Sequence, residues 1–307
     1  MPVAYIFPGQ GSQYVGMGKD LAEKSAQARD LFARADDILG VKLSQICFEG
    51  PEDQLKQTKN TQPAIFVHSI VLTHLIEKQD VAMVAGHSLG EYSALVYAGA
   101  MSFEEGLKLV RLRGELMQHA GEVEKGTMAA VVGLNPAVLE ELCREASGEG
   151  VVQCANFNSP GQIVISGSVT GVRRGMELAK AKGAKLVKEL VVSGAFHSPL
   201  MQTAREGFRS ALSAARISDA KIPVVTNVTA RPAQKAQEIR TLLEEQLTSP
   251  VRWEESVACM ASAGVTSFVE IGPGKVLQGL VRRIAPSVEI RGIDTFADLH
   301  ATMTAQA

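Results

Sequence analysis

Short apolar runs alternate along most of the chain with longer segments in which apolar residues recur every three or four positions. The runs that we predict to be strands are Val3–Phe7, Met83–Ala85, Val224–Thr226, Ser267–Glu270 and Glu289–Gly292. Alternation of buried strands with helical segments is typical of a parallel sheet that carries helices on both faces. The pattern therefore predicts an α/β fold for most of the chain.

The middle of the chain has a different order of elements. Thr127–Leu134 is a predicted strand, and Asn135 then caps a helix that opens with Pro136. The further predicted elements are the strands Val151–Asn156 and Gln162–Ser166 joined by a turn at 158–161, a helix at Thr170–Lys182 and a strand at Lys185–Val192. This β-α-β-β-α-β order is that of ferredoxin-like units.

The two patterns together predict the organisation of the chain. We expect residues 1–125 and 193–307 to form a discontinuous large α/β domain, α/β-hydrolase-like with a parallel sheet. Residues 126–192 are expected to form a ferredoxin-like small subdomain inserted into it, and about seventy residues suffice for such a unit.

Composition and charge exclude several classes of protein. The chain has 307 residues, 46% of them hydrophobic, and a net charge of −2, so it can bury a large core and offers no basic tract for nucleic acid. It lacks the basic segment of a secretion signal, and the apolar stretch Pro63–Ile76 is shorter than the ~18 residues of a membrane span. The four cysteines lie far apart, without metal-ligand spacing. We therefore expect a cytoplasmic protein that binds neither membranes nor nucleic acid.

Residues 86–90, with the sequence GHSLG, have the spacing of a nucleophile elbow. The strand-like run Val81–Ala85 precedes them and the helix-like run Tyr92–Ala98 follows, which is the context that such an elbow requires. Glycines two positions before and after Ser88 remove side chains that would clash in the tight turn. We therefore predict that Ser88 is a nucleophile and that the N–H of Leu89 stabilises the oxyanion.

A serine nucleophile needs an imidazole to take its proton. His197 lies in a loop after the last strand of the inserted unit, and position alone leaves it and His300 as equal candidates. His87 adjoins the serine at a sharp turn where successive side chains point apart, so we expect it to shape the elbow. His68 and His74 lie in an apolar helix-like run and are expected to be core or surface residues.

The position of the acid separates two functions. An α/β-hydrolase orders its triad serine, then aspartate or glutamate, then histidine. No aspartate occurs between Ser88 and His197, so with His197 as base the triad would use a glutamate or lack an acid. With His300 as base, Asp219 or Asp294 could complete a triad, and the protein would be a serine esterase.

One arginine lies on the apolar side of a predicted helix that a Ser102–Glu105 capping box opens. The neighbours of Arg113 at three and four positions along this helix are all apolar, namely Leu109, Val110, Leu116 and Met117. A buried guanidinium is costly unless an anion meets it, and an internal ion pair is one explanation. The other is a bidentate clamp for a substrate carboxylate, which would suggest a dicarboxylic acyl group on the serine.

Motifs in a fixed order along the chain carry a family resemblance. They are residues 7–13 (FPGQGSQ), 60–64 (NTQPA), 86–95 (GHSLGEYSAL), 156–162 (NFNSPGQ), 194–198 (GAFHS) and 270–274 (EIGPG). Together they resemble the malonyl acyltransferase family of fatty acid and polyketide synthesis, which includes malonyl-CoA:acyl carrier protein transacylases. The resemblance spans nearly the whole chain.

The resemblance implies roles for particular residues. It implies a catalytic dyad of Ser88 and His197 in place of a triad, with the imidazole oriented by the backbone carbonyl of Gln246. The further implied roles are oxyanion donation by the N–H groups of Gln10 and Leu89, pairing of Arg113 with the malonyl carboxylate, a malonyl-type pocket residue at Phe196, and support of the site by Gln62 and Asn156.

The implied reaction is a ping-pong transfer of malonyl from coenzyme A to the phosphopantetheine thiol of an acyl carrier protein. It needs no metal or redox cofactor, and the glycine-rich segments 9–14 and 272–275 lack the spacing of nucleotide-binding loops. An acidic carrier protein would dock on a basic patch, for which the candidates are Arg173, Arg174, Lys180, Lys182, Lys185 and Lys188, or Lys275, Arg282 and Arg283. A serine esterase and an inactive interaction protein remain alternatives, and the second would have lost Ser88 or His197.

Overall fold

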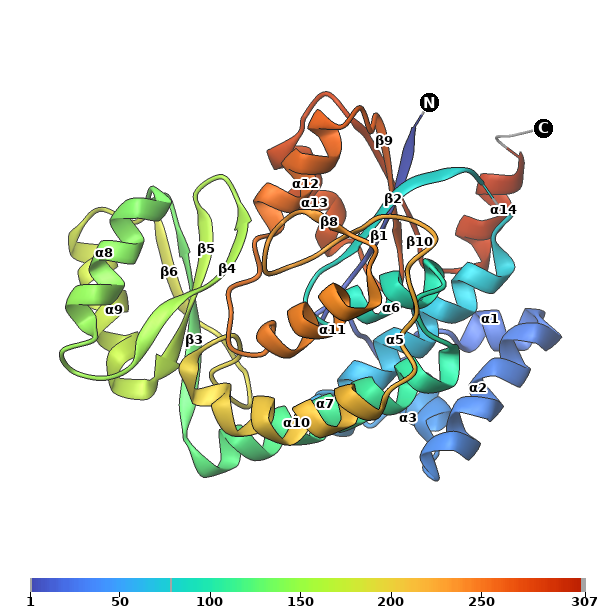
Figure 1. The fold of residues 1–307 in the computed structure, drawn as a ribbon, viewed down its shortest axis with the longest axis horizontal. Coiled ribbons are helices and arrows are strands. Elements are labelled where there is room, and N and C mark those ends of the chain that lie inside the picture. Colours follow the sequence, from blue (N-terminus) through green and yellow to red (C-terminus); the bar gives the residue numbers. More distant parts are fainter. Residues whose placement is uncertain (1, 78, 305–307) are drawn as a thin grey trace.

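The computed structural model describes residues 2–77 and 79–304 and contains two sheets. The larger sheet has the strand order β10-β9-β1-β2-β7-β8 (Figure 1). Its strands are β1 (Val3–Phe7), β2 (Val81–Gly86), β7 (Val224–Val225), β8 (Pro232–Ala233), β9 (Ser267–Ile271) and β10 (Glu289–Ile293). All neighbours pair in parallel except β7 and β8. The predicted parallel sheet is confirmed, whereas the two-residue antiparallel β8 was not predicted, because so short a segment has no periodicity to read.

Helices cover both faces of this sheet, and the alternation of β1 shows why. Tyr5 and Phe7 point into one core, and Ala4 and Ile6 point into the other. The first core is built from α1 (Lys19–Lys24), α2 (Ala26–Leu39), α3 (Leu43–Glu49), α4 (Glu52–Leu55), α5 (Thr58–Leu75), α6 (Gly90–Tyr97), α7 (Phe103–Val123), α10 (Gln202–Ala214), α11 (Ala236–Glu245) and α14 (Phe296–Thr304). The second core is covered by α12 (Trp253–Ser262) and α13 (Val276–Ile284). A 3₁₀ turn, Pro199–Met201, leads into α10.

The smaller sheet is antiparallel, has the order β4-β5-β3-β6 and lies to the left in Figure 1. Its elements are β3 (Gly126–Val132), α8 (Pro136–Ala146), β4 (Val152–Ser159), β5 (Gln162–Ser168), α9 (Val169–Ala181) and β6 (Leu186–Glu189). Asn135 caps α8 as predicted, since its side chain accepts a hydrogen bond from Ala137 N. β4 extends into the predicted turn, and β6 ends before Leu190, earlier than predicted. The ferredoxin-like order itself is confirmed.

The two sheets meet along β4. Asn156 forms a parallel bridge with Val251, the residue that precedes α12 by two positions. Backbone hydrogen bonds run from Phe157 N to Val251 O over 2.9 Å and from Val251 N to Ala155 O over 2.8 Å. The small sheet is therefore fixed by main-chain pairing to the segment of the large domain that follows α11.

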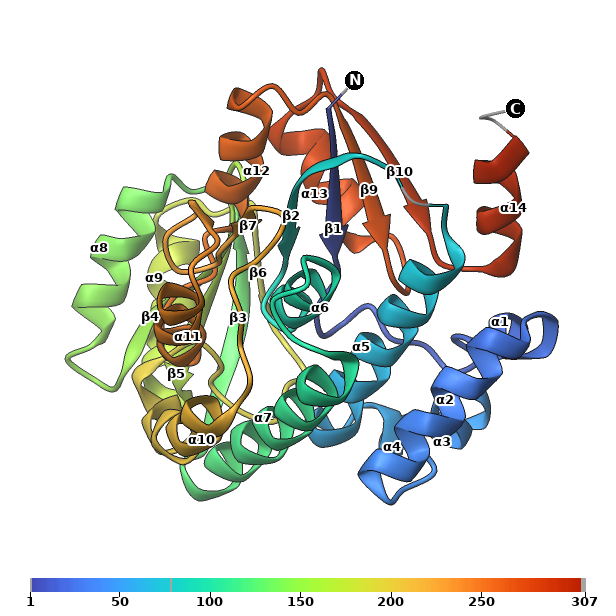
Figure 2. The same cartoon turned by 45° about the vertical axis from the view of Figure 1, so that its right-hand side comes forward.

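Long helices carry several of the polar residues described below. Figure 2 shows α5 and α7 crossing beneath the large sheet, where they pack against each other. α5 contains buried polar residues along its first turns, including Thr61 and Gln62, and α7 contains the buried Arg113. None of the helices in residues 2–77 and 79–304 is long and apolar enough to cross a membrane.

Candidate active site

A strained turn places Ser88 between β2 and α6. β2 ends at Gly86, α6 begins at Gly90, and Ser88 has a positive φ of 50°. A Cβ on Gly86 would lie 1.9 Å from the carbonyl carbon of Gly90, and a Cβ on Gly90 would lie 2.0 Å from Phe7 O. Both glycines are therefore required by contact with backbone, and the strand–turn–helix predicted for this segment is present.

Asn227 holds this turn from the neighbouring strand. Its Oδ1 accepts a hydrogen bond of 2.6 Å from Ser88 N, and its Nδ2 donates one of 2.6 Å to Gly86 O. The residue is buried and follows β7 by two positions. Sequence reasoning missed it, although its place just beyond the carboxyl end of a parallel strand is where such sheets carry functional groups.

The structure brings His197 to the serine. Ser88 Oγ lies 2.8 Å from His197 Nε2, and His197 Nδ1 lies 2.9 Å from the carbonyl oxygen of Gln246. Because a carbonyl oxygen can only accept a hydrogen bond, Nδ1 carries the ring proton and donates a hydrogen bond to Gln246 O. Nε2 is then the unprotonated nitrogen and accepts from the Ser88 hydroxyl. This is the tautomer that a general base for Ser88 requires.

The imidazole is held in its neutral form. The pKa of His197 is lowered to about 3, chiefly by burial and next by the positive charge of Arg113, whereas the hydrogen bond to Gln246 opposes the shift. The side chain is only 3% exposed. At neutral pH the ring is therefore free to accept a proton.

Arg113 is a fully buried cation beside the nucleophile. Its Nη2 donates to Ser88 Oγ over 3.0 Å and to Gln246 Oε1 over 2.9 Å, and its Nη1 donates to Gln62 Oε1 over 2.8 Å. The guanidinium stacks over the ring of Tyr92 at 5.6 Å. Its Nε is buried without a partner. The oxygens that accept these three hydrogen bonds belong to two amides and a hydroxyl, so all of them are uncharged.

A buried carboxylate supports the same group of residues. Glu91, in the first turn of α6, accepts hydrogen bonds of 2.9 Å at Oε2 from Asn227 N and from Gln246 Nε2. Gln246 Nε2 also lies 3.1 Å from Ser88 O. Burial raises the pKa of Glu91 to about 7, against the lowering effect of its hydrogen bonds and of Arg113. Sequence reasoning missed Glu91, although a carboxylate one helical turn after a predicted nucleophile indicates a residue that could support the site.

The nucleophile opens into a cavity of about 230 Å³. Its polar lining includes Gln10, Gln62, His87, Ser88, Arg113, Asn156, Asn158, Gln162 and His197, and its apolar walls include Leu89, Met117, Met128, Val164, Leu190, Val192, Phe196 and Leu280. All residues that the sequence singled out for this site therefore line it, apart from Gln246, which lies behind His197. The backbone N–H groups of Gln10 and Leu89 donate to no acceptor among the described residues.

His87 occupies the position expected for a residue that shapes the elbow. Its ring is buried against Trp253, and its Nε2 lies 2.8 Å from Asn158 Oδ1 at the end of β4. Burial lowers the pKa of His87. The residue thus points away from Ser88 Oγ and contacts the small sheet.

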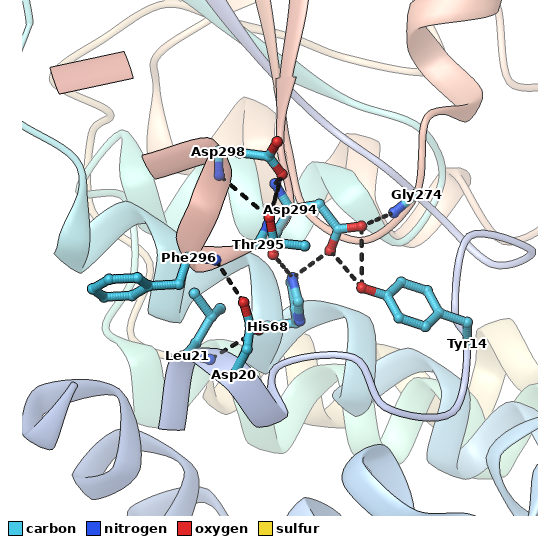
Figure 3. Close-up of polar contacts among 9 residues, drawn as sticks. All are labelled: Tyr14, Asp20, Leu21, His68, Gly274, Asp294, Thr295, Phe296 and Asp298. Carbon is cyan, nitrogen blue, oxygen red and sulfur yellow. Dashed lines mark hydrogen bonds and ion pairs between the residues drawn. The ribbon is translucent and has the colours of Figure 1, made fainter. Parts of the chain in front are cut away.

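The residues of the alternative esterase triad lie elsewhere. His300 packs against the ring of Phe296 in α14, and Asp219 is an exposed partner of Lys235. Asp294 accepts from Tyr14 and from Gly274 N and lies 3.1 Å from His68 Nε2, in the cluster drawn in Figure 3. The structure therefore places His197, and not His300, beside the hydroxyl of Ser88. No group of three or more His, Cys, Asp or Glu in the described part of the chain could hold a metal ion.

The chain belongs to the acyl transferase domain family, whose model matches residues 4–294. The strained turn at Ser88 and the imidazole beside it, which has no carboxylate partner, are compatible with acyl transfer. Two relatives carry the same name. The chain is 48% identical over 285 residues to malonyl CoA-acyl carrier protein transacylase of Bacillus subtilis (strain 168), which covers 92% of this chain and 90% of that one. It is 41% identical over 297 residues to the protein of that name from Staphylococcus aureus (strain COL), over 96% of each chain.

Solved structures agree with the fold. The malonyl CoA-acyl carrier protein transacylase of Coxiella burnetii superposes with a TM-score of 0.96 at 38% identity, over 99% of this chain and 97% of that one. The acyl-carrier-protein-S-malonyltransferase of Bartonella henselae superposes with a TM-score of 0.95 at 42% identity, over 99% of each chain. A chain in the solved complex of a type II PKS acyl-carrier protein with its malonyl-transacylase superposes with a TM-score of 0.95 at 38% identity, over 99% of this chain and 100% of that one.

Proposed function

We propose that this protein transfers a malonyl group from coenzyme A to the phosphopantetheine thiol of an acyl carrier protein, for fatty acid or polyketide synthesis. The supporting observation is the fully buried guanidinium of Arg113, whose Nη2 lies 3.0 Å from the hydroxyl oxygen of Ser88, whose Nε has no partner, and whose described contacts include no ion pair with a carboxylate. Such a cation is costly unless an anion arrives with the substrate. A free carboxylate at the far end of the acyl group meets this requirement.

The reaction proceeds in two halves. His197 Nε2 takes the hydroxyl proton as Ser88 Oγ forms a bond to the thioester carbon, and the N–H groups of Gln10 and Leu89 stabilise the oxyanion. The C–S bond then breaks, and the thiolate of coenzyme A leaves with the proton from the imidazolium. In the second half, the carrier thiol gives its proton to His197 and attacks the malonyl ester. Ser88 recovers its proton when the new thioester forms.

Neutral groups replace the acid of a hydrolase triad in this proposal. Gln246 orients the imidazole through its carbonyl oxygen and fixes Arg113 through its side chain. Phe196, Gln62 and Asn156 support the acyl pocket. The reaction exchanges one thioester for another, so we propose that it uses no metal or redox cofactor and takes place in the cytoplasm.

We further propose that residues 126–192 act as one subdomain between the two halves, 1–125 and 193–307, of the catalytic domain. The carrier protein would dock near the cavity mouth, where α13 contributes Val276 and Leu280 to the lining. The adjoining Lys275, Arg282 and Arg283 offer positive charge for an acidic partner. Arg174 on α9 offers less, because three glutamates already pair with it.

Labelling with radioactive malonyl-CoA tests the central proposal. The wild-type protein, incubated without carrier protein and then denatured, is expected to carry one malonyl group on Ser88, and Ser88→Ala none. Adding carrier protein should discharge the label onto its phosphopantetheine. Release of free malonate without a labelled intermediate would instead indicate a hydrolase, and neither label nor malonate from folded protein would indicate an inactive scaffold.

A further inference from the structure

A side chain of the small sheet holds the backbone of the proposed catalytic base. Gln153, half-buried on β4, donates a hydrogen bond of 2.8 Å from Nε2 to the carbonyl oxygen of His197. The same nitrogen lies 3.3 Å from the carbonyl oxygen of Thr248. These acceptors belong to the two segments that build the base, since Thr248 follows by two positions Gln246, whose carbonyl accepts the hydrogen bond from His197 Nδ1. One amide group thus joins the ring-bearing segment to the segment that orients the ring.

The backbone of His197 needs such a restraint. Its φ is 56°, in the left-handed region that residues with a Cβ rarely adopt. A strained conformation of this kind persists only where the surroundings fix it. The bond from Gln153 fixes the peptide group on the C-terminal side of His197, whereas the bond to Gln246 O fixes the ring.

The strand that carries Gln153 is itself rigidly placed. Two residues further along β4, Ala155 O accepts from Val251 N, and Phe157 N donates to Val251 O. Gln153 extends this row of contacts between β4 and the large domain by one side-chain bond. We infer that Gln153 is a positioning residue that keeps the His197 imidazole aimed at Ser88 by holding the carbonyl oxygens of His197 and Thr248; the inference rests on the proposed function.

Loss of the Gln153 donor is expected to change the rate at which Ser88 is acylated and to leave substrate binding unaffected. Gln153 does not line the cavity of Ser88, and the groups that would hold the malonyl carboxylate are anchored on α5 and α7. Small displacements of a catalytic group lower rates by up to about a hundredfold. Loss of the Gln153 donor should therefore slow formation of malonyl-Ser88 about ten- to a hundredfold, with the KM for malonyl-CoA nearly unchanged.

Two substitutions separate the hydrogen bond from packing. Gln153→Met fills the same volume without a donor, and Gln153→Glu has the same shape. An ionised carboxylate cannot donate and would face two carbonyl oxygens, whereas a protonated one can donate to one of them. Single-turnover labelling of Ser88 between pH 8 and pH 5 is therefore expected to show a constant deficit for Gln153→Met. For Gln153→Glu the deficit should be larger at pH 8 and should shrink as the pH falls.

The matched control is Gln234→Met. Gln234 Nε2 also donates to a main-chain oxygen, Ala220 O at 3.1 Å, but far from the cavity lining. The Gln234→Met variant should form malonyl-Ser88 at the wild-type rate. A wild-type rate in Gln153→Met, or equal deficits in both Gln153 variants at every pH, would overturn the inference. Absence of label in the wild-type protein would instead overturn the proposed function, so the two failures are distinguishable.

Discussion

Arg113 donates a hydrogen bond of 3.0 Å to the hydroxyl oxygen of Ser88, and the same oxygen lies 2.8 Å from His197 Nε2. The serine oxygen is thus held on two sides, by a cation and by an imidazole, which in the proposed reaction stabilise developing negative charge and take the proton. The Nε of the same guanidinium is buried without a hydrogen-bond partner. A single side chain can therefore activate the nucleophile and recognise a dicarboxylic acyl group.

Substitution of Arg113 should change which acyl group the protein accepts. Arg113→Ala is expected to slow acylation by malonyl-CoA about a hundredfold or more, because a buried carboxylate would lose its charged partner. Arg113→Lys should recover little, since an ammonium group cannot form the bidentate pair. Acylation by acetyl-CoA should fall much less in both variants. Equal losses for the two donors, measured by single-turnover labelling, would contradict the role of the arginine as a carboxylate clamp.

The buried His197 should make the protein less stable in acid. Its folded-state pKa of about 3 lies below the ordinary value of 6.5, so the unfolded chain binds the proton first as the pH falls. Stability that is complete above pH 6.5 is therefore lost progressively down to about pH 3. This contribution should cost about 2 kcal/mol of unfolding free energy between pH 7 and pH 5.

Urea unfolding at these two pH values checks the effect. His197→Asn, which can still donate to Gln246 O, should lose about 2 kcal/mol less than the wild type on going from pH 7 to pH 5. His119→Asn, with its side chain 66% exposed on α7, is the control and should follow the wild type. The same pH dependence in the wild type and in His197→Asn would show that the imidazole is protonated in the folded protein.

Ionisation of Glu91 should make the unfolding free energy depend on pH in the opposite direction to His197. Its pKa is raised to about 7, so the folded protein keeps the proton while the unfolded chain releases it near pH 4.5. Stability from this group is present below pH 4.5 and is lost as the pH rises to about 7. Glu91→Gln removes the effect, and relative to this variant the wild type should lose about 2–3 kcal/mol between pH 5 and pH 8. A constant difference between the two unfolding curves would indicate a carboxylate that is already ionised at pH 5.

The elbow glycines should tolerate no side chain. Gly90→Ala would place a Cβ 2.0 Å from Phe7 O, a backbone atom of the central strand that cannot move aside. We expect a loss of about 3 kcal/mol or more in unfolding free energy, and no labelling of Ser88. Gly279→Ala is the control, because nothing lies within 4 Å of its added Cβ in α13. The unfolding free energy of this control variant should rise by about 0.5–1 kcal/mol. Thermal unfolding of both variants tests the contrast.

Local patterns predicted the parts of the site that depend on neighbours in the chain. The elbow around Ser88 follows from glycine spacing and flanking elements, and the buried face of Arg113 follows from helical periodicity. Position alone could not choose between His197 and His300; the family resemblance chose the first, and the distance to Ser88 agrees with that choice.

Contacts between distant segments could not be predicted in this way. Asn227 reaches Ser88 across 139 positions, and Gln246 reaches Glu91 across 155. Such partners become neighbours only when β2 and β7 are paired and α11 is packed, and neither spacing nor propensity encodes that meeting. Gln153 is a further example, because nothing about a glutamine in a strand indicates that its amide will meet a strained carbonyl 44 positions away.

The position of β1 in the sheet has a consequence for synthesis of the chain. β1 precedes both of its partners in the chain: β2 can pair with one of its edges early, whereas its other edge pairs with β9, which contains residues 267–271. Until β9 has left the ribosome, the strand that leads to the Gln10 loop keeps a row of unsatisfied N–H and C=O groups along one edge. Chains truncated before β9 are therefore expected to aggregate through this exposed strand edge as well as to lack activity.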